Sequence, residues 1–132
     1  MGHGMQRLQS RAQFQAVLAG ATVARTPHFA LHRCALPSST DASKSLFATA
    51  DDAWLGAMVP KRWARRAVTR NAIKRQIYSV STETEFAWPS AAHVVRLRAA
   101  FDRKQFASAR SDPLKAAVRA ELRQLFAKGA RA

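Results

Sequence analysis

The sequence has few acidic residues, one cysteine and no long apolar run, and each shortage excludes a class of protein. Only eight of the 132 residues are Asp or Glu, against 22 Lys and Arg, which leaves a net charge of +14. Cys34 is alone, so an internal disulfide is impossible and a reducing compartment is favoured. No segment approaches about 18 consecutive apolar residues, and the first residues lack the apolar part of a signal peptide. We therefore expect a cytoplasmic protein with no membrane segment.

The scarce acidic residues fall mostly where loops and helix caps are expected, which argues against a hydrolytic centre in the protein. Asp51-Asp52 and Glu83 with Glu85 could bind a metal, but solvated loop acids are the ordinary interpretation of such pairs. There is no glycine-rich phosphate loop and no zinc-ligand spacing, and the four histidines have no evident Ser or Cys partner. We expect no catalytic residue and no metal site in the protein.

Positive charge is what the sequence has in excess, and it is concentrated in residues 61–75. Seven of these fifteen residues are Lys or Arg, and none is acidic. Apolar residues including Ile73 and Ile77 recur through the tract at helical spacing, which predicts a helix over about 64–80. Arg outnumbers Lys, and its planar guanidinium pairs with phosphate and stacks on bases. A folded array of cations in this form favours a nucleic-acid partner.

The remaining periodicity predicts one α+β domain, a small α/β sandwich with its helices packed on a four-stranded sheet. Ser10 and Gln13 can form a capping box, Asp112 with Pro113 can start a helix, and Gly129 can end it. Residues 1–6 and 127–132 are expected to be flexible ends. The expected order is α-β-β-β-α-β-α, with a helix at 10–19, strands at 22–25, 29–36 and 54–59, the basic helix, a strand at 93–99 and a closing helix from 112.

A few side chains near the expected first helix could stack on unpaired bases. Phe14, Phe29 and His32 are the candidates, although ordinary core positions are the alternative for the two phenylalanines and a satisfied strand histidine for His32. Phe29 and His32 are three residues apart on one predicted strand, so they should face opposite sides of the sheet. Only one of them can line a given cleft, and His32 is on the less apolar side.

The sequence at residues 70–75, Arg-Asn-Ala-Ile-Lys-Arg, resembles the R-N-R-x-K-R signature of the bacterial ribonuclease P protein subunit. Ala72 stands where that signature has its second Arg. The resemblance extends over most of the chain and keeps the family's order of elements. The segments that carry it are Leu8 to Leu18 (first helix), 29–31 (aromatic strand), 55–62 (strand and basic turn), 65–67, 93–98 (last strand) and the closing helix.

The resemblance implies a function that the residues alone do not. In that family the catalytic subunit is an RNA that uses Mg²⁺ to remove the 5′ leader of precursor tRNA. The protein binds this RNA through its basic helix and the leader through a cleft between first helix and sheet. A left-handed β-α-β crossover around the basic helix is also implied, against the usual right-handed rule. The expected partners are ribonuclease P RNA and precursor tRNA, with no obligate protein partner.

Two sets of binding residues follow. We expect Arg66, Arg70 and Lys74 to form one ridge toward RNA phosphates, and Asn71 to orient the array. The expected RNA-binding residues are Lys61, Arg62, Arg65, Arg66, Arg70, Asn71, Lys74 and Arg75. The expected leader-binding residues are Phe14, Phe29, His32, Arg33, Arg96 and Arg98.

Two other classes of nucleic-acid-binding protein stay open on the residues alone. One is a ribosomal or other structural RNA-binding protein of similar small fold, and the other is an architectural DNA-binding protein. Both need phosphate contacts, so a basic helix does not separate them from the first hypothesis. Neither gives a reason for Arg-Asn at this spacing.

Overall fold

The computed structural model describes residues 5–36, 53–83, 88–101 and 112–130. The predicted α+β class is confirmed, and the predicted element order is found with one strand added at the start. In chain order the elements are β1 (Gln6–Arg7), α1 (Arg11–Leu18), β2 (Ala21–Arg25), β3 (Phe29–Ala35), β4 (Trp54–Met58), α2 (Ala67–Ser81), β5 (Ala91–Leu97) and α3 (Asp112–Ala130).

The strands form one mixed sheet in the order β1-β4-β5-β3-β2. β4 is parallel to both β1 and β5, whereas β3 is antiparallel to β5 and β2. The chain therefore leaves β4, forms α2 and returns to the neighbouring parallel strand β5, which is the β-α-β connection expected for the basic helix. The left hand of this crossover stays a prediction.

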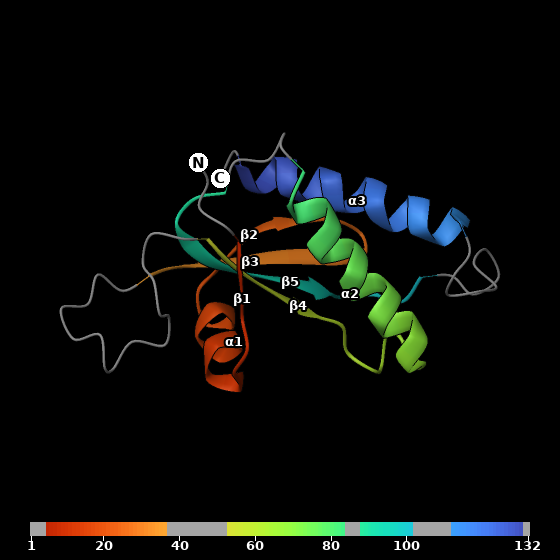
Figure 1. Cartoon of the computed structure of the whole chain (residues 1–132), viewed down its shortest axis with the longest axis horizontal. Helices are drawn as coiled ribbons and strands as arrows, with labels where there is room; N and C mark the ends of the chain where they lie inside the picture. Colours follow the sequence, from red (N-terminus) through yellow and green to blue (C-terminus); the bar gives the residue numbers. More distant parts are fainter. Residues whose placement is uncertain (1–4, 37–52, 84–87, 102–111, 131–132) are drawn as a thin grey trace.

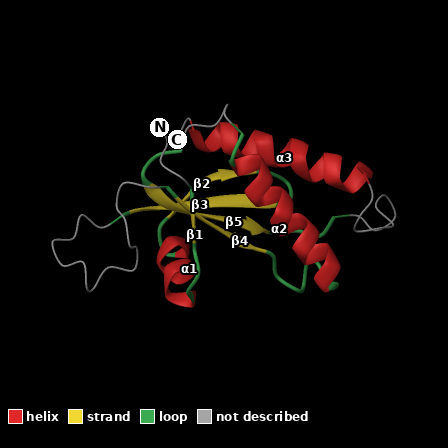
Figure 2. Ribbon diagram, viewed as in Figure 1, coloured by secondary structure: helices red, strands yellow, loops and turns green. Residues whose placement is uncertain are grey.

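The helices cover the two faces of the sheet unequally. α2 and α3 pack side by side on one face, and α1 lies against the other (Figures 1 and 2). The larger core lies under α2 and α3 and includes Phe29, Leu55 and Leu122. The smaller core lies under α1 and includes Val17 and Val94, with Phe14 packed against it. Strand alternation produces both cores, because neighbouring residues of β3 and β5 point to opposite faces.

The predicted four-stranded sheet is wrong in its strand count, whereas the flexibility expected of residues 1–6 stays a prediction. Gln6 and Arg7 form a fifth strand beside β4, where Gln6 N–H donates to Ala53 O at 2.9 Å and Leu8 N–H donates to Leu55 O at 3.0 Å. A two-residue strand is too short to show a period in the sequence, so only its tertiary pairing defines it. Residues 1–4 lie outside the described residues.

The helix ends were predicted with mixed success. The capping box of Ser10 and Gln13 is present at the start of α1, as expected. α2 begins at Ala67 and not at 64, because Arg66 has an extended backbone (φ −84°, ψ 133°). Gly129 does not end α3, which continues to Ala130, and the flexibility expected of residues 127–132 stays a prediction. A Cβ at position 129 would lie 2.5 Å from Leu31 Cδ2, so glycine there permits close packing of the helix on β3.

Candidate nucleic-acid interface

The exposed side of α2 and the turn before it carry the seven cations of residues 61–75. We call this surface the basic face. Five of the seven are exposed, and Arg70 and Lys74 are half-buried. Within the described ranges, none of the seven forms an ion pair. No carboxylate of the described residues therefore neutralises their charges. The exposed five are Lys61, Arg62, Arg65, Arg66 and Arg75.

Arg70 fixes the turn that leads into α2. Its Nη1 donates to the carbonyl oxygens of Ala64 at 3.0 Å and Arg65 at 2.7 Å. These bonds tie the first turn of the helix to the segment just before it, where no side chain caps the helix. Arg70 is thus a structural member of the basic face, and its predicted place on a phosphate-binding ridge stays a prediction.

Asn71 was expected to orient the array, either through a neighbouring turn or through a ribose hydroxyl. Its side chain is exposed and, among the described residues, has no hydrogen-bond partner, so the contact to a turn is not found. Arg70 makes that contact instead. Asn71 lies at the edge of a groove of about 570 Å³ together with Lys74 and Arg75, where it is accessible to a ligand.

Arg7 is a member of this surface that the sequence analysis missed. Its guanidinium carbon lies 4.0 Å from the centroid of the Tyr78 ring, which is a cation–π contact, and it lines the same groove as Asn71. Tyr78 is held in turn by the backbone N–H of Ala57, which donates to its hydroxyl at 3.2 Å. Nothing in the sequence near Arg7 points to α2, because the contact depends on β1 pairing with β4.

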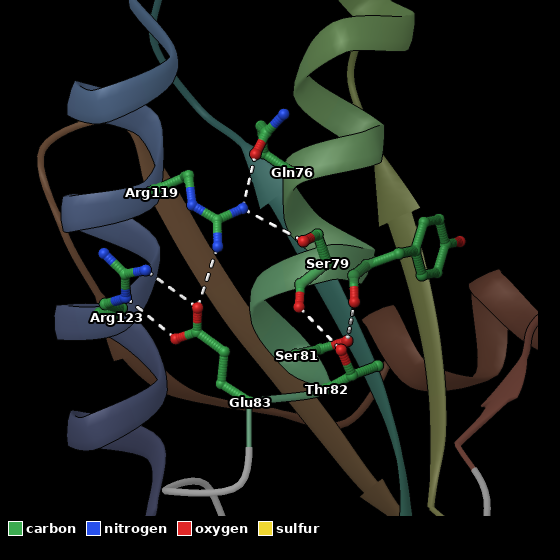
Figure 3. A network of polar contacts seen from close by, with 8 residues as sticks. Gln76, Ser79, Ser81, Thr82, Glu83, Arg119 and Arg123 are labelled. Atoms are coloured by element: carbon green, nitrogen blue, oxygen red, sulfur yellow. Dashed lines mark hydrogen bonds and ion pairs between the residues drawn. The ribbon is translucent and has the colours of Figure 1, made fainter.

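The arginines of α3 are used differently from those of α2. Glu83, just after α2, accepts hydrogen bonds from Arg119 Nη2 and from Arg123 Nε and Nη2, each at 2.9 Å (Figure 3). Arg119 Nη1 also donates to Gln76 Oε1 at 2.7 Å and to Ser79 Oγ at 3.1 Å. This network joins α2 to α3, and one carboxylate is shared by two arginines.

Phe14 and His32 lie on the opposite side of the sheet, which we call the α1 face. Phe14 is half-buried over β4, where a Cβ at Gly56 would lie 2.5 Å from its ring. His32 projects to the same side from β3, and Arg96 lies beside it on β5. The prediction that Phe29 and His32 face opposite sides is confirmed, because Phe29 is fully buried in the core under α2 and α3.

His32 is not an open stacking surface. Its side chain is almost covered, with 6% of the residue exposed, and both ring nitrogens have partners. Arg96 Nε donates to His32 Nε2 at 3.1 Å, and Nδ1 lies 3.1 Å from Thr22 Oγ1. Burial lowers the pKa of His32, and the neighbouring charges of Arg96 and Arg25 lower it further. The ring is therefore neutral near pH 7, with Nε2 as acceptor.

Two of the expected leader-binding residues do not lie on the α1 face. Phe29 and Arg33 share the other face of β3 by strand alternation, and Arg33 donates to His93 Nε2 at 2.9 Å and to Gly129 O at 3.1 Å beneath α3.

Arg98 is exposed, but its Nη1 donates to Thr26 O at 2.9 Å, so it holds the β2–β3 turn. Arg25, which the sequence analysis passed over, lies opposite Ala30 at the sheet edge.

The described residues contain neither a membrane-spanning helix nor a cluster of metal ligands. No described helix has the length and apolar character that a membrane crossing requires. In the part of the chain that the structure describes, no three His, Cys, Asp or Glu side chains come together as metal ligands would. Asp51, Asp52 and Glu85 lie outside the described residues.

The sequence is similar to known proteins of one family. Residues 3–128 match the family model described as Ribonuclease P. The "Ribonuclease P protein component" of Burkholderia pseudomallei is 42% identical over 86 residues, 63% of this chain and 61% of that protein. The chain thus spans about three fifths of the length of that relative. The component of Bordetella parapertussis is 35% identical over 129 residues, 95% of this chain and 92% of that protein.

Solved structures agree in fold. The ribonuclease P protein from Thermotoga maritima superposes with a TM-score of 0.61 at 20% identity, covering 92% of this chain and 94% of that one. The protein from Staphylococcus aureus gives 0.59 at 20% identity, with 90% of each chain covered. At such identities the likeness concerns the fold, whereas the family match covers nearly the whole sequence. The chain belongs to the Ribonuclease P family.

Proposed function

We propose that this chain is the protein subunit of ribonuclease P, which helps an RNA subunit to remove the 5′ leader of precursor tRNA. The observation that carries the proposal is the basic face formed by α2 and the turn before it, whose seven cations have no carboxylate partner within the described residues. Membership of the family supports the same function. The bond-breaking step belongs to the RNA, and no residue of this chain is assigned a catalytic role.

The proposed contact with ribonuclease P RNA runs along α2. Arg66 at the start of α2 and Lys74 further along are eight residues apart, which corresponds to roughly 12 Å of helix, and Arg65 and Arg75 lie next to them in the sequence. That distance spans two or more phosphates of an RNA strand. Arg70 keeps Arg65 and Arg66 in place through its bonds to the turn, and Arg7 extends the surface across Tyr78. Phosphate contacts of this kind position the protein without reading sequence.

The proposed contact with the leader lies on the α1 face. A leader is single-stranded, so its recognition combines an apolar or aromatic surface for bases with cations for the backbone. Phe14 offers the half-exposed ring, and Arg96 and Arg25 offer the cations. Mg²⁺ is proposed to act through the RNA subunit, and no site for it is assigned to this chain.

A reconstituted cleavage assay tests the proposal. Purified protein is added to a ribonuclease P RNA at low Mg²⁺ with precursor tRNA labelled at its 5′ end, and release of the leader is measured. The proposal predicts a large increase in the cleavage rate over RNA alone. A variant with Arg65, Arg66, Lys74 and Arg75 changed to Gln is the matched control and should stimulate weakly. A folded wild-type protein that binds RNA but leaves cleavage unchanged would support a structural RNA-binding protein instead.

A further inference from the structure

Two arginine–histidine pairs lie on opposite faces of the same two strands. On the α3 side, Arg33 of β3 donates from Nε to His93 Nε2 of β5 at 2.9 Å. On the α1 side, the strands exchange roles, and Arg96 of β5 donates from Nε to His32 Nε2 of β3 at 3.1 Å. Each histidine also has a partner at Nδ1, which is Trp54 O for His93 and Thr22 Oγ1 for His32. The chemistry of the two pairs is the same.

The surroundings of the two guanidinium groups differ. Arg33 uses Nη2 to donate to Gly129 O at 3.1 Å, and α3 covers the pair. Arg96 is half-buried, and among the described residues its terminal nitrogens have no hydrogen-bond partner. Four N–H groups of a fixed planar fork are thus left for a ligand. The buried pair completes the core, whereas the other presents donors at the surface.

Arg96 can be held in this way only by a neutral histidine. A protonated ring donates from both nitrogens and cannot accept from Nε of arginine. Arg25 on β2 and Arg96 on β5 both face His32, and their charges disfavour a third cation between them. The same two arginines make the site electropositive, so an anionic group is the ligand that it suits.

We propose that Arg96, positioned by His32, binds a backbone phosphate of the single-stranded leader on the α1 face. His32 is then a positioning residue and not a base-stacking surface. This inference rests on the proposed function and adds the atoms that hold the leader. Arginine pairs with phosphate through two parallel N–H donors, and fixing Nε in advance leaves the terminal nitrogens oriented and reduces the ordering cost of binding.

Substitution of His32 separates positioning from stacking, in holoenzyme reconstituted with a ribonuclease P RNA. His32→Phe keeps an aromatic ring but removes the acceptor, so it should weaken precursor tRNA binding about tenfold, as Arg96→Ala should. His32→Gln keeps an acceptor near the position of Nε2 and should restore most of the affinity. The double variant His32→Phe with Arg96→Ala should bind no more weakly than Arg96→Ala alone. Mature tRNA, which lacks the leader, should bind almost equally to all of them.

The salt dependence of precursor binding provides a readout that a structural role does not move. Although His32→Phe changes no charge at neutral pH, it should lower the slope of log affinity against log salt toward that of Arg96→Ala, by up to about 0.7. His93→Gln on the other face is the control, and should lower the melting temperature but leave the preference for precursor unchanged. Each variant is first checked for cooperative melting above the assay temperature.

Three outcomes would overturn the inference. If folded His32→Phe keeps the affinity and the salt slope of wild type, the ring acts by stacking or as a spacer. If Arg96→Ala weakens precursor and mature tRNA equally, the guanidinium does not bind the leader. If the wild-type holoenzyme itself does not prefer precursor over mature tRNA, leader recognition fails, and the proposed function fails with it.

Discussion

Arginine side chains serve different purposes at the two ends of α2. At its start, Arg65 and Arg66 are exposed and without a carboxylate partner in the described part of the chain. Near its end, Arg119 and Arg123 of α3 converge on Glu83, and Arg119 also contacts Gln76 and Ser79 (Figure 3). The difference teaches that a high net charge does not reveal which cations bind a partner. The positions of the few carboxylates indicate which cations are left available to a partner.

Two of the few carboxylates, those of Glu83 and Glu121, hold elements of the fold together. Glu121 accepts hydrogen bonds from Thr26 Oγ1 and from His28 N–H, both at 2.6 Å, and so ties α3 to the β2–β3 turn. Glu83 ties α3 to α2. Glu83 pairs with two arginines of α3, whereas no carboxylate of the described residues pairs with a cation at the start of α2. The described cations thus fall into those that hold α3 in place and those without a carboxylate partner, which we propose bind RNA.

The largest expected effect is on RNA affinity. Changing Arg65, Arg66, Lys74 and Arg75 together to Gln should weaken binding to ribonuclease P RNA roughly a thousandfold, close to 4 kcal/mol, because about four phosphate contacts are lost. The melting temperature should change little, since these side chains support no described ion pair. Filter binding and thermal melting measure the two quantities. Arg70 is left in place because it holds the turn before α2.

Lowering the pH should destabilise the fold at the buried Arg33–His93 pair beneath α3. Burial lowers the pKa of His93 to about 4, and nearby Arg33 adds to this, despite an opposing hydrogen bond to Trp54 O. The unfolded ring titrates near 6.5, so the unfolded state binds the proton more readily and stability is lost as the pH falls from about 6.5 toward 4. The loss expected from this one group is about 3 kcal/mol.

Denaturant unfolding as a function of pH measures that loss. His93→Gln removes the titrating ring, and the variant should lose less stability than wild type between pH 6.5 and 4. His32, whose pKa is also lowered, contributes in the same direction in both proteins. An identical pH dependence in wild type and His93→Gln would contradict the assignment.

Breaking the network at Glu83 should cost less. Glu83→Gln leaves Arg119 and Arg123 without their carboxylate, and the free energy of unfolding should fall by about 1–2 kcal/mol, since the pair is only partly buried. RNA affinity should not fall, because the substitution adds to the net positive charge. Arg123→Gln, at the more exposed partner, is the matched control and should have a smaller effect. A fall in affinity at unchanged stability would show that this end of α2 also faces RNA.

The smallest effect is expected at Asn71. Asn71→Ala should change the unfolding free energy by less than about 0.5 kcal/mol, because the side chain has no partner among the described residues. If Asn71 contacts a ribose hydroxyl, RNA affinity should fall a few-fold, by about 1 kcal/mol or less. Asn71→Ala that is neutral for both quantities would make this an ordinary surface residue.

The sequence predicted local features well and tertiary ones poorly. Helical spacing located α2 to within a few residues, the Ser10–Gln13 box marked α1, and alternation assigned Phe29 and His32 to opposite faces. β1 was missed because two residues carry no period. Arg33 was placed on the wrong side, since its charge suggested exposure and only the closed fold provides the acceptors His93 and Gly129. The role of Arg70 depends on a turn geometry that spacing does not specify.

The salt dependence of RNA binding tests the division of cations most directly. The slope of log affinity against log salt is measured for three folded proteins: wild type, the four-residue α2 variant, and Arg119→Gln with Arg123→Gln in α3. The account predicts that the α2 variant loses about three to four units of slope, and that the α3 variant keeps the wild-type slope while melting at a lower temperature. Equal losses of slope in the two variants would contradict it, because both sets of arginines would then be bound to phosphate.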